Sequence, residues 1–582
     1  MEGAMKPMNT IGRTIARGLF ACILTITTTS VAAPPHERLF DSNRSAALDP
    51  PYFLSHLDEM HAKGICTADD FMKKGLANKI NRDGLSLAPT ATPFRVLALL
   101  VKFSDHANSV SATFFDSLCF DSANSSVRNY YGEISYSQID LVTVNLPSSV
   151  GWTTAPQTYA YYVDGKTGTG GVYPRNSQKL VEDVVDAVNG VVNFANYDND
   201  GDGYVDVLLV IHSGTGAEFS GSNNDIWSHK WAITPRLKDS VYIRDFTVQP
   251  EFWSTAGDMT IGVYAHELGH GFGLPDLYDT DYSSKGVGKW CLMSYGSWNG
   301  PGGLGASPSH PSAWSRIQMG MATSTNVVSN VTGQSILNVE SGGPIYRLWT
   351  SGGASQEHFL VENRQKTGYD AYIPNDGLLI WHIDDAKTNN TKEDYPGDSL
   401  LGHYLVALEQ ADGLFELDKS IDNGDAGDIY PGTTSATSFN ALSTPSSNSY
   451  SGGSTFVGVE NISASALTMT ADLIVGFAAA TDDGDNPLLP SRVDLSQNYP
   501  NPFNPSTTIE FSVPEAGWVS LEVFNVTGQR VATLLREYVS AAVIRVDWDG
   551  RAENGQPLAS GIYLYRLETE ESSLTRKMVL LK

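Results

Sequence analysis

The pattern of hydrophobic and polar positions changes twice along this chain of 582 residues. In the first long stretch, continuous apolar runs that predict buried strands alternate with segments of helical spacing. The strands are expected at 94–103 and 205–211 and the helices at 126–131, 178–188 and 260–271. Interleaved helices and strands are typical of an α+β domain, which we place at residues 93–325.

After residue 325 the pattern becomes that of a β-rich protein. Short alternating runs separated by Gly, Asn, Asp and Ser predict a β-rich accessory domain at 326–476, packed on the first domain. Residues 477–490 contain Asp, Gly, Asn and Pro and have the composition of a linker. About seven short strands with frequent turns follow at 491–582 and predict an immunoglobulin-like β-sandwich. Several domains are expected for a chain of this length.

The first 33 residues have the pattern of a signal peptide. Three basic residues precede an apolar run at 18–26, and Ser30 and Ala32 provide the small side chains that a cleavage site requires. A membrane anchor is the alternative, but this run is too short to span a bilayer, and no later segment is long and apolar enough. We therefore expect a soluble, exported mature protein. Residues 34–92 are polar, with a helical pattern only between 52 and 79, and are predicted to form a propeptide.

The charge balance is acidic, with 65 Asp and Glu against 38 Lys and Arg and a formal net charge of -27. Such a surface repels nucleic acid and anionic lipid, so neither is an expected partner. It suits extracellular solubility and cation binding, although acidity alone is usually only solvation. A hydrophobic content of 41% is that of a folded globular protein.

One segment has the spacing of a catalytic zinc site. Residues 266–276 read His-Glu-Leu-Gly-His-Gly-Phe-Gly-Leu-Pro-Asp. His266 and His270 are four residues apart, so on a helix they project from one face and can bind one metal ion. Glu267 lies between them and can act as the general base toward a water molecule. Glycines at 271 and 273 favour a turn that returns Asp276 as third ligand, which leaves the fourth position open, as in catalytic zinc sites.

A second motif follows the third ligand. Residues 291–296 read Cys-Leu-Met-Ser-Tyr-Gly, and in zinc peptidases with the long motif a methionine-containing turn passes beneath the metal. Met293 fits the apolar floor of such a site, and Tyr295 could donate a hydrogen bond to the oxyanion. A core methionine and a surface tyrosine are the plainer interpretation.

The run 198–206, Asp-Asn-Asp-Gly-Asp-Gly-Tyr-Val-Asp, predicts a calcium loop. Alternation lets three carboxylates converge on one hard cation, the carbonyl of Tyr204 can join them, and Asp206 can complete the loop. The three are Asp198, Asp200 and Asp202. Leu209 stands where an EF-hand has its bidentate glutamate, so this is a related loop with a structural role. A solvated turn is the alternative.

Two further groups of polar residues are weaker candidates. Asp422, Asp425 and Asp428 form a second acidic cluster in the sequence. His212 and His229 are more simply explained as residues of the core or its surroundings than as ligands.

Four cysteines occur, at positions 22, 66, 119 and 291. Cys22 leaves with the signal peptide, and the three that remain cannot all pair. A Cys119–Cys291 disulfide and two buried thiols are equally compatible with the sequence. Cys66 lies in the predicted propeptide, where its thiolate could bind the zinc ion and keep the enzyme latent.

Residues 266–278 resemble the immune-inhibitor-A-like (M6) metallopeptidases, which are metzincin-like but use Asp as the third zinc ligand. The resemblance continues through several motifs over roughly 94–435: 126–136, 225–231, 310–320, 357–364 and 377–383. It implies a metzincin-like catalytic domain and a secreted endopeptidase acting on proteins, with one catalytic Zn2+ and usually Ca2+.

The C-terminal region resembles a different family. Residues 498–509, 561–567 and 577–582 are similar to type IX secretion C-terminal sorting domains. That resemblance implies delivery by bacterial secretion machinery to the outside or the cell surface of a two-membrane bacterium. A carbohydrate-binding or adhesive sandwich is the alternative for this region.

Together these patterns predict a secreted zinc-dependent endopeptidase, expected to be a monomer, that hydrolyses proteins or peptides. The alternative is a secreted binding or adhesion protein on an inactive peptidase scaffold. Loss of Glu267 or of a zinc ligand would mark that alternative, and the sequence retains all of them.

Overall fold

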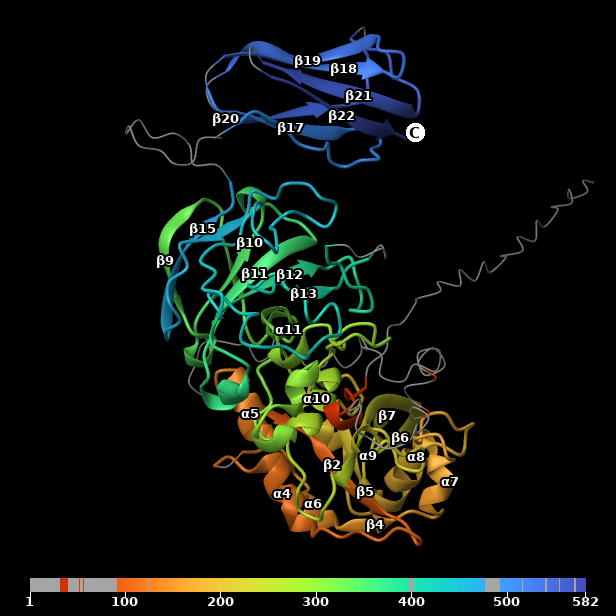
Figure 1. The fold of residues 1–582 in the computed structure, drawn as a ribbon. Coiled ribbons are helices and arrows are strands. Elements are labelled where there is room, and N and C mark those ends of the chain that lie inside the picture. Colours follow the sequence, from red (N-terminus) through yellow and green to blue (C-terminus); the bar gives the residue numbers. More distant parts are fainter. Residues whose placement is uncertain are drawn as a thin grey trace, which may run out of the picture.

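In the computed structural model the chain forms three successive regions, coloured orange to green, green to cyan, and blue in Figure 1. The structure describes residues 32–39, 52, 56, 92–396 except 124, 402–476, and 492–581 except 516, 540–541, 554 and 570–571. The predicted linker at 477–490, Cys66 and almost all of the predicted signal peptide lie outside these residues. In the described part of the chain, no helix has the length and apolar character needed to cross a membrane.

The first region is built on a five-stranded sheet in the order β4-β2-β5-β7-β6. Its strands are β2 (Leu97–Lys102), β4 (Trp152–Thr154), β5 (Leu208–Thr215), β6 (His229–Lys238) and β7 (Val241–Phe252). All neighbours pair in parallel except β6, which runs antiparallel to β7 at the edge of the sheet. Because helices cover both faces, β2 is an almost continuous apolar run, Leu-Ala-Leu-Leu-Val-Lys.

Successive residues of β2 belong to different cores, as the two-residue period of a strand requires. Leu97 and Leu99 pack with the apolar face of α8 (Ser177–Val188). Ala98 and Leu100 belong to the core on the other side, which contains three longer helices. These are α4 (Ala112–Phe120), α5 (Val127–Ile134) and α10 (Gly262–Gly271). The shorter helices of the region are α6 (Pro147–Val150), α7 (Tyr159–Val163), α9 (Ala217–Ser220) and α11 (Ala313–Gln318).

The strand predicted at 94–103 is two strands in the structure. β1 (Thr92–Arg95) pairs with β3 (Ile139–Val142), and β2 then pairs with β4 and β5. A continuous apolar run cannot reveal a change of pairing partner, because both strands are buried. Boundaries also shift elsewhere: β5 begins three residues later than predicted, and α10 begins at Gly262, two residues later.

The middle region contains two sheets and no α-helix among its described residues, so the prediction of a β-rich region holds. One sheet has the order β13-β12-β11-β10-β8 and the other β14-β15-β9. The strands are β8 (Ser324–Asn326), β9 (Val331–Leu337), β10 (Ile345–Leu348), β11 (Glu357–Arg364), β12 (Gly377–Asp384), β13 (Val406–Leu408), β14 (Gly458–Glu460) and β15 (Thr468–Ile474). Leu360, Leu379 and Trp381 enter the same core as α10, so the middle region and the first share one hydrophobic interior.

The described residues of the C-terminal region form seven strands in two sheets, in the orders β16-β17-β20 and β19-β18-β21-β22. They are β16 (Asp494–Leu495), β17 (Thr507–Val513), β18 (Gly517–Asn525), β19 (Arg530–Val539), β20 (Ala542–Trp548), β21 (Gly561–Glu568) and β22 (Ser573–Leu580). Both sheets contribute to one core, for example Phe511 from β17 and Tyr565 from β21. The immunoglobulin-like topology itself stays a prediction.

Candidate metal centre

Helix α10 carries both histidines, and a glycine turn returns the third ligand. Gly273 adopts φ of +85°, a left-handed conformation that glycine tolerates. Its N–H donates to the carbonyl of His270 at 2.9 Å, and the N–H of Leu274 donates to the carbonyl of Gly269 at 3.1 Å. These bonds close the helix end, as in C-terminal caps, and the chain then brings Asp276 back to the histidines.

The two imidazoles are held in a single tautomer. Nδ1 of His266 lies 2.9 Å from the carbonyl oxygen of Leu292, and Nδ1 of His270 lies 2.8 Å from that of Leu274. Because a carbonyl oxygen only accepts hydrogen bonds, each Nδ1 carries the hydrogen and each Nε2 presents a lone pair. The two Nε2 atoms are 3.1 Å apart, and Asp276 Oδ1 lies 3.1 Å and 3.5 Å from them.

This donor set fits a bound cation. Two lone pairs and a carboxylate oxygen face one another in a fully buried position, and Asp276 Oδ1 has no hydrogen-bond donor among the described residues. Burial, and next the neighbouring His266, lower the pKa of His270 well below its usual value, and burial raises the pKa of Asp276 to about 6. Two imidazole nitrogens and one carboxylate oxygen are the ligands of a catalytic zinc site.

Glu267 lies beside these ligands and is completely buried. Its Oε1 accepts a hydrogen bond from the N–H of Ala33 at 3.0 Å, whereas Oε2 lacks a partner within the described part of the chain. Burial and then the nearby Asp276 raise the pKa of Glu267 well above its usual value. A carboxylate with a free oxygen at this position can take up a proton.

The turn at 291–296 passes against α10. Met293 is buried, and a Cβ built on Gly269 would lie only 2.6 Å from its Sδ, so the glycine permits close contact between helix and turn. Tyr295 is 1% exposed and therefore not a surface residue. Its hydroxyl has no hydrogen-bond partner among the described residues.

Cys291 and Cys119 are both buried free thiols, so the structure has no disulfide between them.

The chain's own residues 32–39 begin directly against the candidate ligands. Ala32 pairs with His229 at the start of the edge strand β6 in an antiparallel bridge, and its N–H donates to Asp276 Oδ2 at 2.9 Å. Residues 32–35 are buried. Three side chains donate to successive carbonyl oxygens of this segment: Tyr278 to Ala32 (2.7 Å), Trp227 to Ala33 (3.1 Å) and Trp298 to Pro34 (2.9 Å).

The rest of the segment is anchored by two further contacts. His36 Nε2 lies 3.0 Å from the carbonyl oxygen of Gly303, and Lys289 forms a 2.8 Å ion pair with Glu37. Neither the segment's location nor the three donors followed from the sequence. Trp227 and Tyr278 do belong to the motifs that carry the family resemblance, which was the available signal.

The predicted calcium loop brings three of its five residues together. Carboxylate oxygens of Asp198, Asp200 and Asp202 lie within 4.8 Å of one another. Asp206 is not part of this group, and its Oδ2 accepts a hydrogen bond from the N–H of Asn199 at 2.5 Å. Burial, and after it the other carboxylates, raise the pKa of Asp206 to about 7. Tyr204 bridges to Tyr242 beside the sheet.

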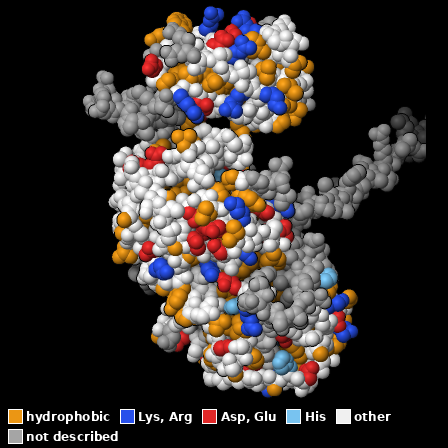
Figure 2. Space-filling view, in the orientation of Figure 1, with side chains coloured by type: hydrophobic (Ala, Val, Ile, Leu, Met, Phe, Trp, Pro, Cys, Tyr) orange, Lys and Arg blue, Asp and Glu red, His pale blue; other side chains and the backbone are white. Residues whose placement is uncertain are grey.

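The second acidic cluster is larger than the sequence indicated. Asp425 and Asp428 meet Asp412 in one group, while Glu416, Asp422 and Asp425 form another. Acidic side chains also gather on the visible face of the middle region in Figure 2, whereas Lys and Arg are frequent on the C-terminal region.

His212 and His229, the two histidines predicted to belong to the core or its surroundings, are fully buried. Nε2 of His229 lies 2.8 Å from Ser177 Oγ, and burial lowers the pKa of His229 to about 4.

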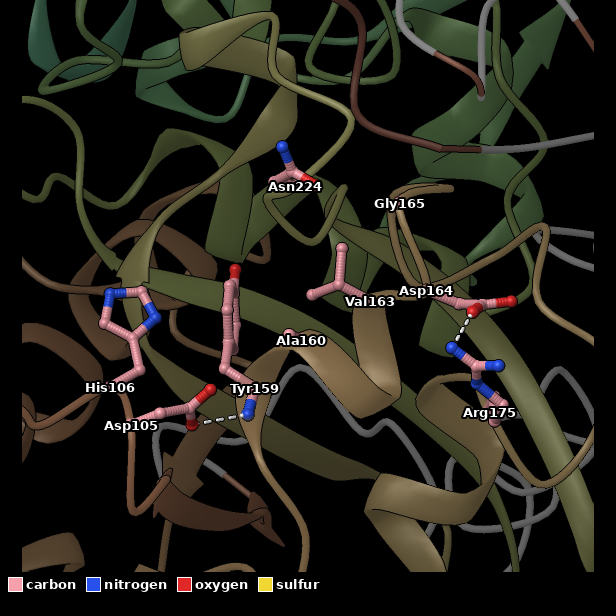
Figure 3. A pocket seen from close by; sticks show the side chains of 9 residues that line it. All are labelled: Asp105, His106, Tyr159, Ala160, Val163, Asp164, Gly165, Arg175 and Asn224. Carbon is pink, nitrogen blue, oxygen red and sulfur yellow. Dashed lines mark hydrogen bonds and ion pairs between the residues drawn. The ribbon is translucent and has the colours of Figure 1, made fainter.

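A separate cavity of about 500 Å³ lies in the first region (Figure 3). None of the predicted site residues lines it; its wall includes His106, Tyr159 and the ion pair between Asp164 and Arg175.

Two segments match known families. Residues 111–322 match "Immune inhibitor A peptidase M6, catalytic domain", and residues 497–581 match "Secretion system C-terminal sorting domain". The first region therefore belongs to the class of metallopeptidase domains. More particularly, the chain carries an M6 catalytic domain of the immune inhibitor A type, followed by a secretion sorting domain. The sorting domain identifies a secreted or cell-surface protein of a Gram-negative bacterium.

Two relatives share part of the sequence. Immune inhibitor A of Bacillus thuringiensis subsp. alesti is 33% identical over 182 residues, 26% of this chain and 26% of that protein. Pre-pro-metalloprotease PrtV of Vibrio cholerae serotype O1 (strain M66-2) is 31% identical over 224 residues, 33% of this chain and 23% of that protein. The chain thus spans about a quarter of the length of the curated relatives it matches.

Among solved structures, OgpA from Akkermansia muciniphila is similar over 84% of this chain and 94% of its own, with 9% identity. The TM-score of 0.23 is too low for that likeness to support an argument. The M6 match ends at residue 322, so the motifs at 357–364 and 377–383 lie outside it.

Proposed function

We propose that the chain is the precursor of a secreted zinc-dependent endopeptidase with a metzincin-like catalytic domain. The observation that supports this most directly is the arrangement of His266, His270 and Asp276 around one point, with Glu267 beside it and a peptide main chain lying across it. A closed structural zinc site would have a fourth protein ligand, whereas the described residues bring three together here.

When bound, zinc would polarise the substrate carbonyl and lower the pKa of a water molecule. Glu267 takes the proton of the attacking water while the water oxygen bonds to the carbonyl carbon. The carbon–nitrogen bond then breaks, its electron pair stays on nitrogen, and Glu267 returns the proton to that nitrogen. The 3.0 Å hydrogen bond from the Ala33 N–H to Glu267 places a peptide nitrogen where this return would occur.

We also propose that residues 34–92 act as a propeptide and that their first residues keep the enzyme latent. Pro34 and Pro35 are buried against the candidate site, so they obstruct it while they remain. Latency through a thiolate of Cys66 stays a separate prediction.

Calcium is proposed as a structural ion at Asp198, Asp200 and Asp202. Three carboxylates within 4.8 Å repel one another unless a cation or protons neutralise them. Burial first, and then Asp200, raise the pKa of Asp202, as expected for a crowded set of acids without its cation.

The alternative, a binding or adhesion protein on an inactive scaffold, is less well supported, because Glu267 and all three ligands are present and converge. The deciding experiment is hydrolysis of fluorescent casein by the purified chain after limited proteolysis and with calcium present. We expect activity that 1,10-phenanthroline removes and that falls about 10⁴-fold in Glu267→Ala, the upper range for a general base.

Zinc content provides the control, since Glu267→Ala should still bind one zinc ion. A wild-type chain that binds zinc but never cleaves casein, before or after proteolysis, would favour the binding protein. Equal activity in Glu267→Ala would rule out the assigned base.

A further inference from the structure

The peptide bond between Ala32 and Ala33 lies beside Asp276 and Glu267 of the candidate metal centre. Its nitrogen, on Ala33, donates to Glu267, and its oxygen, on Ala32, accepts from the hydroxyl of Tyr278 at 2.7 Å. The residue on the carbonyl side also donates through its own N–H to the ligand Asp276. One peptide unit thus contacts the proposed base through its nitrogen and a phenol through its oxygen.

The carbonyl oxygens of the next two residues also accept hydrogen bonds from side chains of the first region. Trp227 Nε1 donates to the carbonyl oxygen of Ala33, and Trp298 Nε1 donates to that of Pro34. With the antiparallel bridge of Ala32 to His229 on β6, the main chain is fixed on both sides of the Ala32–Ala33 bond. Main-chain contacts of this kind set the position of a peptide independently of its side chains.

Tyr278 is well placed to stabilise a developing negative charge. It follows Asp276 by two residues, is 2% exposed, and donates its hydroxyl to the carbonyl oxygen whose peptide nitrogen contacts Glu267, with the Asp276 carboxylate as a second neighbour of that hydroxyl. Donors within about 3 Å of such an oxygen, fixed before the reaction, are what an oxyanion site requires.

Tyr295 does not have this arrangement. Its ring centroid is 6.2 Å from that of Tyr278, and its buried hydroxyl contacts no donor or acceptor in the described part of the chain. Lys285 lies over its ring, 5.6 Å from the centroid. Tyr295 therefore lines the site behind Tyr278 without reaching the peptide.

We propose that Tyr278 is a catalytic residue that donates its hydroxyl hydrogen bond to the scissile carbonyl oxygen. The inference rests on the proposed peptidase function and replaces the predicted role of Tyr295. As the water oxygen bonds to the carbonyl carbon, the π electrons move onto the carbonyl oxygen, and the Tyr278 hydrogen bond strengthens. When the carbon–nitrogen bond breaks, the carbonyl re-forms and Tyr278 keeps its proton throughout.

The test compares Tyr278→Phe with Tyr295→Phe, each a loss of one hydroxyl oxygen from a buried ring. Both are made in the full chain, activated by limited proteolysis, and assayed on a fluorogenic peptide. We expect kcat of Tyr278→Phe to fall about 10²- to 10³-fold with KM nearly unchanged, as for loss of one oxyanion donor. Tyr295→Phe should lower kcat far less than Tyr278→Phe does.

A purely structural role would lower zinc content or thermal stability, so both are measured on each variant. A second readout is a phosphinic peptide that imitates the tetrahedral state. Its affinity for Tyr278→Phe should fall by the same factor as kcat/KM, while affinity for uncleaved substrate is retained. Wild-type kcat in Tyr278→Phe, or a large loss in Tyr295→Phe, would overturn the assignment.

The register can be tested with the wild-type chain alone, which covers the case of a misfolded variant. A synthetic peptide of residues 28–37 is incubated with the activated enzyme, and the masses of its products are measured by mass spectrometry. Cleavage between Ala32 and Ala33 is expected. Cleavage only at another bond, or binding without cleavage while casein is cut, would contradict the assignment, whereas an enzyme inactive on casein would contradict the proposed function instead.

Discussion

Two fully buried clusters of charged residues differ in how completely the protein satisfies them. At the metal centre, Glu267 Oε2 and Asp276 Oδ1 lack donors among the described residues. In the ionic network between α11 and β11, both oxygens of each carboxylate accept hydrogen bonds. Asp370 accepts two from Arg364 at 2.6 Å, and Glu362 accepts from Arg316 at 2.5 Å and from Arg364 at 3.2 Å.

The network joins regions that are far apart in sequence. Arg316 belongs to α11 of the first region, and Glu362 and Arg364 belong to β11 of the middle region. Burial alone would raise the pKa of Asp370, but the Arg364 guanidinium holds it well below its usual value. The paired carboxylates of this network link the two regions, whereas the unpaired oxygens of the candidate metal centre leave room for a ligand and for proton transfer.

The largest predicted effect is that a substitution in the ionic network lowers stability, whereas a substitution at the candidate metal centre lowers activity. Asp370→Asn removes the carboxylate that accepts the two shorter hydrogen bonds of the buried Arg364 and leaves Glu362 as its paired carboxylate, so we expect a loss of about 3–5 kcal/mol in the free energy of unfolding. Glu267→Ala should abolish activity but preserve or increase stability, because it removes a buried carboxylate with an unpaired oxygen. Urea unfolding followed by tryptophan fluorescence, together with zinc content, measures both.

Equal destabilisation by the two substitutions would show that the clusters do not differ in the way described. Ser125→Ala changes an exposed hydroxyl outside both clusters and is the control for effects of producing and purifying a variant.

In the metal-free chain, lowering the pH should change the stability contributed by the two clusters in opposite directions. The lowered pKa of Asp370 means that its stabilisation is present above the ordinary carboxyl pKa of about 3.9 and is lost as the pH falls through its folded-state pKa. The pKa of Asp276 is raised to about 6, so its ionisation costs stability, and that cost disappears as the pH falls below about 6.

Unfolding of wild type, Asp370→Asn and Asp276→Asn in chelator, from pH 7 to pH 3, tests these signs. The difference between wild type and Asp370→Asn should stay constant to about pH 4 and shrink below it. Asp276→Asn should be the more stable chain at pH 7 and lose that advantage toward pH 4. Parallel curves for the two variants would contradict the assigned pKa shifts.

The smallest effect is expected at the half-exposed calcium loop, where water screens the repulsion between carboxylates. Calcium at about 100 times its Kd should stabilise the chain by about 2–3 kcal/mol. Asp202→Asn should remove most of this gain in a thermal melt with and without chelator. Asp376→Asn, an aspartate outside both acidic clusters, is the control, and an equal loss of the calcium effect there would argue against the loop as the site.

The sequence by itself determined what depends on short spacing. His266 and His270 share a helix face because they are four residues apart, and Gly273 permits the turn that returns Asp276. The β-rich character of the middle and C-terminal regions likewise followed from local alternation. Family motifs indicated the M6 domain and the sorting domain before any contact was known.

Only the tertiary structure decided which residues meet across long separations. Ala32 reaches Asp276 over 244 positions, and Arg316 reaches Glu362 over 46, so no periodic pattern records either contact. The hydroxyl contacts of Tyr278 and Tyr295 are of the same kind, since both are buried tyrosines near the motif but only that of Tyr278 donates to Ala32. Hydrophobic periodicity fixes which face of an element is buried, whereas the partner on that face depends on how the whole chain packs.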